Sequence, residues 1–160
     1  MTYWGFSGDE QVSAWLALSE ANDLSGAMKM VPGSHKMGKQ QHEITNDKDN
    51  VLLQGQTVRN VNEELSVLCS LKPGQASFHH GWTLHTSMPN KSDDRRIGLN
   101  IQYIATHIKQ LKNDKDTAIC VRGYDEFNHF LKDEPAKVEI DFDALERFKE
   151  LDKQYKKTAS

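Results

Sequence analysis

Three polar residues in the middle of the chain have types and spacing that suit the binding of a metal and an anion. They are His85, Ser87 and Arg96, in the segment FHHGWTLHTSMPNKSDDRR at residues 78–96. Because side chains alternate along a strand, His85 and Ser87 share one face of the strand expected over residues 82–87. A neutral imidazole on the inner face of a small barrel is a good metal ligand. An arginine nearby suits a carboxylate, which its planar guanidinium binds through two parallel hydrogen bonds.

The position of Arg96 also implies an anion. Arg96 opens the next expected strand, on the same face as Gly98, and so points into the same interior. A buried guanidinium without an acidic partner is costly, which favours a bound anion there. The alternative is an ordinary ion pair with Asp93 or Asp94 in the preceding turn. For His85, the alternative is a structural histidine held by hydrogen bonds.

Three further histidines and one tryptophan are candidates for supporting roles. His79 and His80 are neighbours on an expected strand, so one faces the interior and the other the outer surface. Either could support a metal ligand or contact the substrate, and His35 in VPGSHK could also contact a substrate. Trp15 lies on the small, polar side of its strand. Its indole N–H either donates to a ligand or the ring simply packs.

The composition limits the class of protein. A chain of 160 residues fits a single domain, residues 1–160, with a real core. The net charge of −3 gives no electrostatic footprint for nucleic acid, and no apolar run approaches the roughly 20 residues of a membrane span. The N-terminus lacks the pattern of a secretory signal. Cys69 and Cys120 are far apart and indicate buried thiols of a reducing compartment, so we expect a cytoplasmic protein.

Short strands separated by turn residues dominate the first three quarters of the chain. This pattern predicts a mainly β protein, a barrel or jelly roll whose β core covers residues 1–125. A polar stretch without periodicity, residues 36–50, is expected to be a surface loop. Strands are expected within residues 11–19, 28–31, 56–61, 65–71, 76–80, 82–87, 96–105 and 117–123.

The end of the chain changes to a helical period. An amphipathic helix is predicted over residues 140–157, with Asp143 and Glu146 as a capping box at its start. Its apolar residues recur every three or four positions, at Phe142, Leu145, Phe148, Leu151 and Tyr155.

Four segments, taken together, resemble the phytanoyl-CoA dioxygenase family of iron(II)- and 2-oxoglutarate-dependent oxygenases. In chain order they are TYWGFSGDEQVSAWLALSEAN, LSGAMKMVPGSHK, NVLLQGQTV and LKPGQASFHHGWTLHTSMPNKSDDRRIGLNIQYI, within residues 2–107. The resemblance implies a double-stranded β-helix, which is a jelly roll of two sheets. It also implies Fe(II) and 2-oxoglutarate as cofactors and a small-molecule substrate.

The resemblance assigns roles to four residues. His85 matches the distal histidine of the iron-binding triad, whose other members are a His-x-Asp pair. Arg96 matches the arginine that binds the far carboxylate of 2-oxoglutarate, and Ser87 lies where a hydroxyl assists it. Trp15 matches a tryptophan near the co-substrate.

The His-x-Asp pair is the point of departure from the family. The family carries it just before a TYWG-like segment, here at residues 2–5, and no His-x-Asp occurs elsewhere in the sequence. We therefore expect an N-terminally truncated oxygenase domain that is inactive as it stands. Its exposed sheet edges would pair between copies in a homo-oligomer. The alternatives are a non-catalytic module that binds a small molecule or a partner, and a cupin-like metal protein that uses His79 and His80 with His85.

Overall fold

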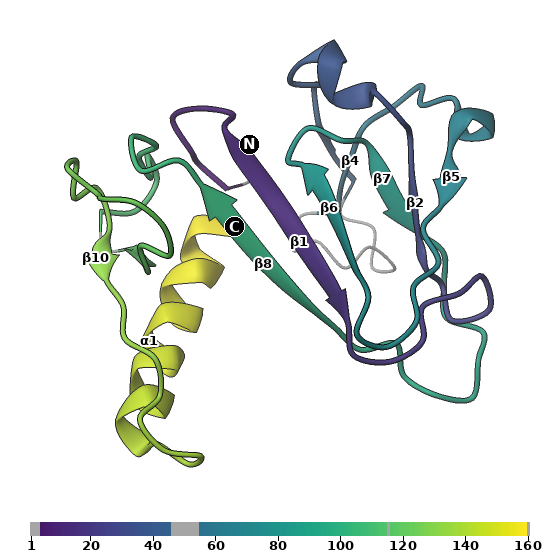
Figure 1. The fold of residues 1–160 in the computed structure, drawn as a ribbon. Coiled ribbons are helices and arrows are strands. Elements are labelled where there is room, and N and C mark those ends of the chain that lie inside the picture. Colours follow the sequence, from purple (N-terminus) through teal and green to yellow (C-terminus); the bar gives the residue numbers. More distant parts are fainter. Residues whose placement is uncertain (1–3, 46–54, 115, 160) are drawn as a thin grey trace. The chain divides into compact units, whose positions relative to one another are not determined.

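A computed structural model describes residues 4–45, 55–114 and 116–159 (Figure 1). The protein is mostly β-structure with one C-terminal helix, and it divides into two compact units. The sheet unit consists of Asp9–Glu43 and Val58–Ile104. The helical unit contains Ile44–Thr57 and the chain from Ala105 onward, together with the N-terminal segment. No helix in the described ranges is both long and apolar enough to cross a membrane.

The first sheet of the sheet unit has three antiparallel strands. They are β1 (Gln11–Ala17), β6 (Ala76–His80) and β8 (Gly98–Ile104), in the order β6-β1-β8. The central strand, β1, follows the alternation of polar and apolar residues that predicts a half-buried strand.

The register of β1 with its neighbours defines one polar face of this sheet. Trp15 lies opposite Ser77 on β6 and Asn100 on β8. Residues that oppose each other in an antiparallel pair point to the same side. The alternation predicted for residues 11–19 is therefore confirmed over β1. The residues of this mostly polar face are Gln11, Ser13, Trp15, Ala17, Ser77, His79, Gly98, Asn100, Gln102 and Ile104.

The second sheet of the sheet unit is shorter. Its strands are β2 (Met28–Met30), β5 (Val67–Leu68) and β7 (His85–Ser87), in the order β5-β2-β7. The two sheets are the layers of the double-stranded β-helix, and β6 runs next to the second sheet in Figure 1. The predicted jelly-roll fold is confirmed.

Ser34 ties the end of β2 to the start of β7. The chain turns at Pro32-Gly33 into the 3-10 helix η1 (Ser34–Met37). The buried Ser34 hydroxyl donates to the carbonyl of Val31 at 2.7 Å and accepts from the N–H of Leu84 at 2.8 Å. These bonds fix the approach to the strand that carries His85.

The remaining elements are short. Helix η1 and strand β3 (Glu43–Ile44) occupy parts of the predicted loop 36–50, and residues 46–50 lie outside the described ranges. Strand β3 pairs with β4, which is Gln56–Thr57. Elsewhere are the 3-10 helix η2 (Glu63–Leu65) and the parallel pair β9 (Thr117–Ala118) and β10 (Leu131–Lys132).

The buried apolar side chains of the sheet unit are mostly small. They are Ala14, Ala17, Ala21, Ala27 and Met28. Small residues allow the backbones of neighbouring segments to approach closely. The two cysteines are free thiols. Cys69 is half-buried, but Cys120 is exposed, so the prediction that both are buried is wrong for Cys120.

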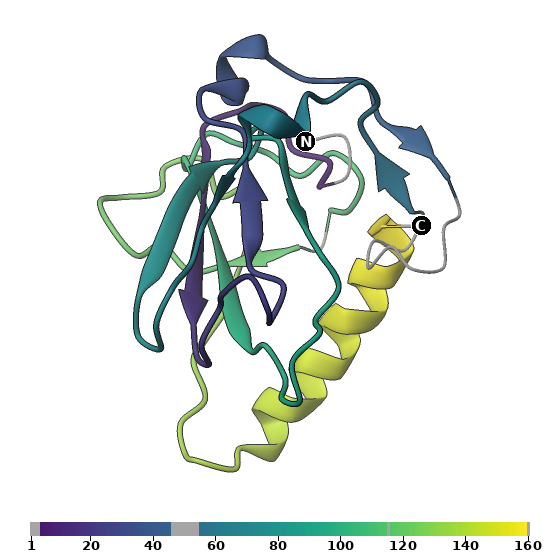
Figure 2. The same ribbon diagram turned by 90° about the vertical axis from the view of Figure 1, so that its right-hand side faces the viewer.

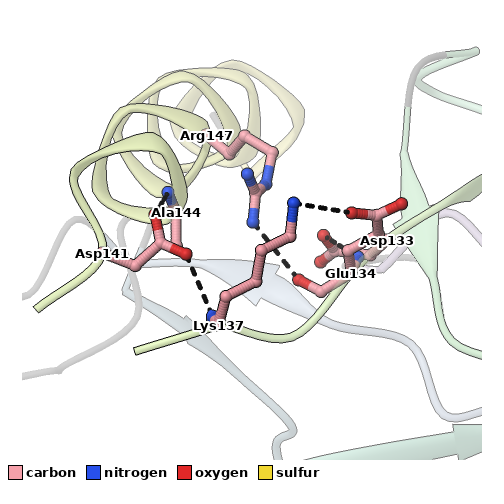
Figure 3. A network of polar contacts seen from close by, with 6 residues as sticks. All are labelled: Asp133, Glu134, Lys137, Asp141, Ala144 and Arg147. Carbon is pink, nitrogen blue, oxygen red and sulfur yellow. Dashed lines mark hydrogen bonds and ion pairs between the residues drawn. The ribbon is translucent and has the colours of Figure 1, made fainter. Parts of the chain in front are cut away.

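Helix α1 (Phe142–Ala159) runs without interruption to the described end of the chain (Figure 2). Its start is capped by Asp141, whose Oδ1 accepts the N–H of Ala144 at 3.0 Å. Oδ2 of the same carboxylate accepts the N–H of Lys137 at 3.0 Å (Figure 3). These two hydrogen bonds, with that of Lys137 first, lower the pKa of Asp141.

The predicted capping box is therefore wrong. Asp143 lies inside the first turn of α1, and the capping position belongs to Asp141 two residues earlier. Glu146 does not reach back to the helix start, because its Oε1 pairs with Nζ of Lys149 at 2.6 Å. The N–H of Lys137, in the loop before the helix, also binds the Asp141 carboxylate and helps to hold it at the capping position. The sequence around Asp141 does not indicate this contact.

Candidate functional site

Arg96 joins two sheets of the sheet unit through side-chain contacts. Its Nη1 donates to the Ser87 hydroxyl at 3.2 Å. Its Cζ lies 5.5 Å from the ring centroid of Trp15, within the range of a cation–π contact. Partial burial lowers the pKa of Arg96. The three residues thus form one cluster, which we call the arginine clamp.

No carboxylate of the described residues forms an ion pair with Arg96. The alternative partner Asp94 instead accepts the backbone N–H of Arg95 at 2.7 Å. Asp93 makes no salt bridge to Arg96 within the ranges that the structure describes. The guanidinium therefore keeps free donors for a carboxylate from a ligand.

Gly98 makes the arginine clamp possible. Gly98 lies on the polar face of β8, two residues before Asn100, which is the partner of Trp15 in the register. A Cβ at residue 98 would collide with the six-membered ring of the Trp15 indole. Only glycine allows the ring to lie this close to the strand. Alternation in the sequence places Gly98 on the same face as Arg96. The contact of the Trp15 indole with Gly98, however, depends on the register between β1 and β8, which are far apart in the sequence.

One ring nitrogen of His85 is held by a backbone carbonyl, and the other has no hydrogen bond to the residues that the structure describes. Its Nδ1 lies 2.8 Å from the carbonyl oxygen of Thr83. A carbonyl only accepts, so Nδ1 carries the proton and Nε2 presents its lone pair. A backbone carbonyl that orients an imidazole in this way is the usual support of a metal-binding histidine. The side chain fits the role of one metal ligand.

His79 lies against His85. It projects from β6 on the polar face, and the two ring centroids are 5.2 Å apart with planes at 54°. Its Nδ1 is buried and has no hydrogen-bond partner in the part of the chain that the structure describes. Burial, and secondarily the neighbouring His85, lower the pKa of His79 to about 4. The ring is therefore neutral at physiological pH.

His80 and His35 form a separate contact. The ring of His80 lies 5.7 Å from that of His35 and 5.4 Å from that of Trp82. Its Nδ1 accepts the backbone N–H of Trp82 at 3.1 Å. Because neighbours on a strand alternate, His80 points to the opposite side of β6 from His79.

This separation removes the support for a cupin-like centre made of His79, His80 and His85. Within residues 4–45, 55–114 and 116–159, no group of three His, Cys, Asp or Glu side chains could hold a metal ion. The described residues fit a carboxylate at the arginine clamp and one imidazole ligand at His85. They do not by themselves complete an iron site.

The chain is similar in sequence to one protein family and to a hydroxylase. The sequence model of the phytanoyl-CoA dioxygenase (PhyH) family matches residues 1–98. The 1-deoxypentalenic acid 11-beta-hydroxylase of Streptomyces arenae is 30% identical over 89 residues, which are 51% of this chain and 30% of that protein.

Two solved structures are similar over much of the chain. The non-heme monooxygenase ThoJ, in its apo form, has a TM-score of 0.81 and 27% identity, over 99% of this chain and 57% of ThoJ. EvdO2 from Micromonospora carbonacea var. aurantiaca, complexed with 2-oxoglutarate, has a TM-score of 0.55 and 28% identity, over 64% of this chain and 41% of EvdO2. The chain thus spans less than two thirds of the length of each relative. Because the family model covers more than half of its residues, the chain belongs to the phytanoyl-CoA dioxygenase family.

Proposed function

We propose that this chain carries the 2-oxoglutarate-binding part of an iron(II)-dependent oxygenase that hydroxylates a small-molecule substrate. The observation that carries the proposal is the arginine clamp. Arg96 is partly buried, stacked on Trp15 and bonded to Ser87, without a described acidic partner. Such a guanidinium is best satisfied by a ligand carboxylate.

The spacing of the site suits a short diacid. His85 and Ser87 lie on the same side of β7, two residues apart, which is about 7 Å because a strand rises about 3.4 Å per residue. A five-carbon diacid held by Arg96 and Ser87 at one end brings its other end toward His85. The indole of Trp15 lies against the guanidinium of Arg96 and helps to hold it in place for the carboxylate.

His85 is the residue of this chain that would hold the metal. Its Nδ1–H bond to the Thr83 carbonyl fixes the ring and leaves Nε2 free. A metal held there, with iron(II) as the expected ion, would supply the activation of dioxygen that C–H hydroxylation requires. We propose that the His-x-Asp ligands of the family pattern come from outside the described residues, and that the 160-residue chain is inactive without them.

A second candidate function is a non-catalytic module that binds a small organic acid. One observation favours it: the described residues contain no group of three side chains that could hold a metal. In this case, the arginine clamp still binds a carboxylate, but no turnover follows when Fe(II) and 2-oxoglutarate are supplied.

Isothermal titration calorimetry with 2-oxoglutarate tests the proposal. A hydrogen bond to a charged group contributes about 1.5–3 kcal/mol, so Arg96→Ala is expected to weaken binding about 10- to 150-fold. The matched control is Arg95→Ala, which removes an exposed neighbouring arginine that contacts neither Trp15 nor Ser87. Equal affinity of the wild type and Arg96→Ala for 2-oxoglutarate would overturn the proposal.

A further inference from the structure

His79 is a polar residue of the site that the family pattern leaves without a role. It lies on the polar face, in register with Ser13 on the neighbouring strand β1. Its ring centroid is 5.2 Å from that of His85 on the other sheet. It therefore stands at the end of the site where His85 lies, whereas Arg96 and Ser87 occupy the other end.

The hydrogen-bonding capacity of His79 is unmet. Its Nδ1 is buried and finds no partner among the described residues. A buried polar group without a partner lowers stability, and native proteins retain such groups mainly where a ligand, an ion or a water completes them. Ser77, on the same face of β6, shows the same feature, since its Oγ is also buried and has no partner within the described ranges.

These two residues lie at the two levels of the site along β6. Ser77 is in register with Trp15, which belongs to the arginine clamp, and His79 lies two residues further along β6 beside His85. The polar groups of β6 thus repeat the spacing of Ser87 and His85 on β7. The far carboxylate already has Arg96, so the group most in need of a donor is the carboxylate at the His85 end.

We propose that the imidazole of His79 donates a hydrogen bond to the 2-oxo acid carboxylate of the bound co-substrate, beside the metal position. The inference rests on the proposed function, because it takes the arginine clamp as the holder of the opposite carboxylate. It makes His79 a binding residue that sets the orientation of the co-substrate. A neutral imidazole carries one N–H, which suits one carboxylate oxygen.

Three related acids separate the two ends of the ligand. In 4-oxopentanoate, a methyl group replaces the carboxylate at the 2-oxo acid end of 2-oxoglutarate. In 2-oxopentanoate, a methyl group replaces the far carboxylate. Calorimetry of the full chain without metal gives the affinity of each acid for the wild type, His79→Phe, His79→Gln and Arg96→Ala.

His79→Phe keeps a planar ring but removes the donor. It is expected to weaken 2-oxoglutarate binding about tenfold or more and to leave 4-oxopentanoate binding unchanged, because the latter has no carboxylate at this end. His79→Gln, which keeps an N–H donor, restores part of the affinity. The matched control is His80→Phe, which alters an imidazole on the opposite side of β6 and leaves both affinities as in the wild type.

The pattern of results distinguishes two failures. Suppose that Arg96→Ala weakens the binding of 2-oxoglutarate more than that of 2-oxopentanoate, but that His79→Phe weakens the binding of 2-oxoglutarate and of 4-oxopentanoate equally. In that case the role proposed for His79 is wrong and the proposed function stands. If Arg96→Ala lowers the affinity for all three acids by the same factor, or if 2-oxoglutarate does not bind to the wild type, the proposed function itself fails. Loss of Co²⁺ binding in His79→Phe as complete as in His85→Phe overturns the inference in favour of a metal-ligand role.

Discussion

Arg96 and Trp15, 81 positions apart in the sequence, stack with the guanidinium carbon 5.5 Å from the centre of the ring. The contact depends on β1 and β8 being neighbours in the first sheet, and on Gly98 leaving room for the indole. The Arg96 guanidinium is therefore held in place by the Trp15 ring and the Ser87 hydroxyl, and its remaining N–H donors can bind an anion.

Gly98→Ala is predicted to move the indole of Trp15 away from Arg96. The new Cβ collides with the ring, and overpacking of this kind costs about 1–3 kcal/mol. We expect lower stability in chemical denaturation, altered near-ultraviolet circular dichroism and weaker 2-oxoglutarate binding. Leu99→Ala is the control, since Leu99 faces the other side of β8, and it should leave 2-oxoglutarate affinity unchanged. Wild-type affinity in Gly98→Ala would show that the indole does not shape the site.

The tautomer of His85 is a second prediction. Because Nδ1 donates to the Thr83 carbonyl, the neutral ring should carry its proton on Nδ1 and leave Nε2 bare. Nitrogen-15 NMR of the imidazoles distinguishes the two tautomers directly. Addition of Zn²⁺ should shift the Nε2 resonance of His85 more than its Nδ1 resonance. A ring protonated on Nε2 would contradict the assignment of His85 as a ready metal ligand.

The pKa of His79 gives a pH-dependent prediction. Burial and the nearby His85 lower it to about 4, whereas an unfolded histidine has a pKa of about 6.5. The unfolded state therefore binds more protons than the folded state between these two values, so stability should fall as the pH is lowered from about 6.5 to about 4. His79→Phe should remove this part of the pH dependence, as measured by urea denaturation. An NMR titration midpoint for His79 near 6.5 would contradict the prediction.

Asp141 and Asp143 form a matched pair for a test of the helix cap. Asp141→Ala removes the acceptor for the Ala144 and Lys137 N–H groups, so it should lower the helical signal in far-ultraviolet circular dichroism. Asp143→Ala should have a smaller effect, because Asp143 lies in the first turn and does not cap it. The lowered pKa of Asp141 means that its contribution is present above about pH 4 and is lost as the pH falls through the folded pKa. Equal effects of the two substitutions would favour the capping box that the sequence predicts.

The sequence predicts the jelly roll and the faces of its strands well. Alternation within residues 11–19 places Trp15 on the polar side, and the register of β1 with β8 confirms that placement. Strands with one polar and one apolar face carry this information locally. The roles of His85, Ser87, Arg96 and Trp15 stay predictions, as do the single domain and the homo-oligomer through sheet edges.

Other features of the site depend on contacts that the sequence does not encode locally. Alternation shows that His79 and His80 point in opposite directions, but the meeting of His79 with His85 requires the two sheets to lie against each other. The need for glycine at position 98 follows from the indole on a neighbouring strand. Tertiary contacts of this kind are set by strand register and by the pairing of sheets.

The arginine clamp is tested most directly by whether 2-oxoglutarate lies between Trp15 and the strand that carries His85 and Ser87. Intermolecular nuclear Overhauser effects between the ligand methylene protons and the Trp15 indole protons measure this in the full chain. The methylene group next to the far carboxylate should show such effects to the indole, and Arg96→Ala should abolish them. Bound 2-oxoglutarate that shows no such effects, or that keeps them in Arg96→Ala, would contradict this placement.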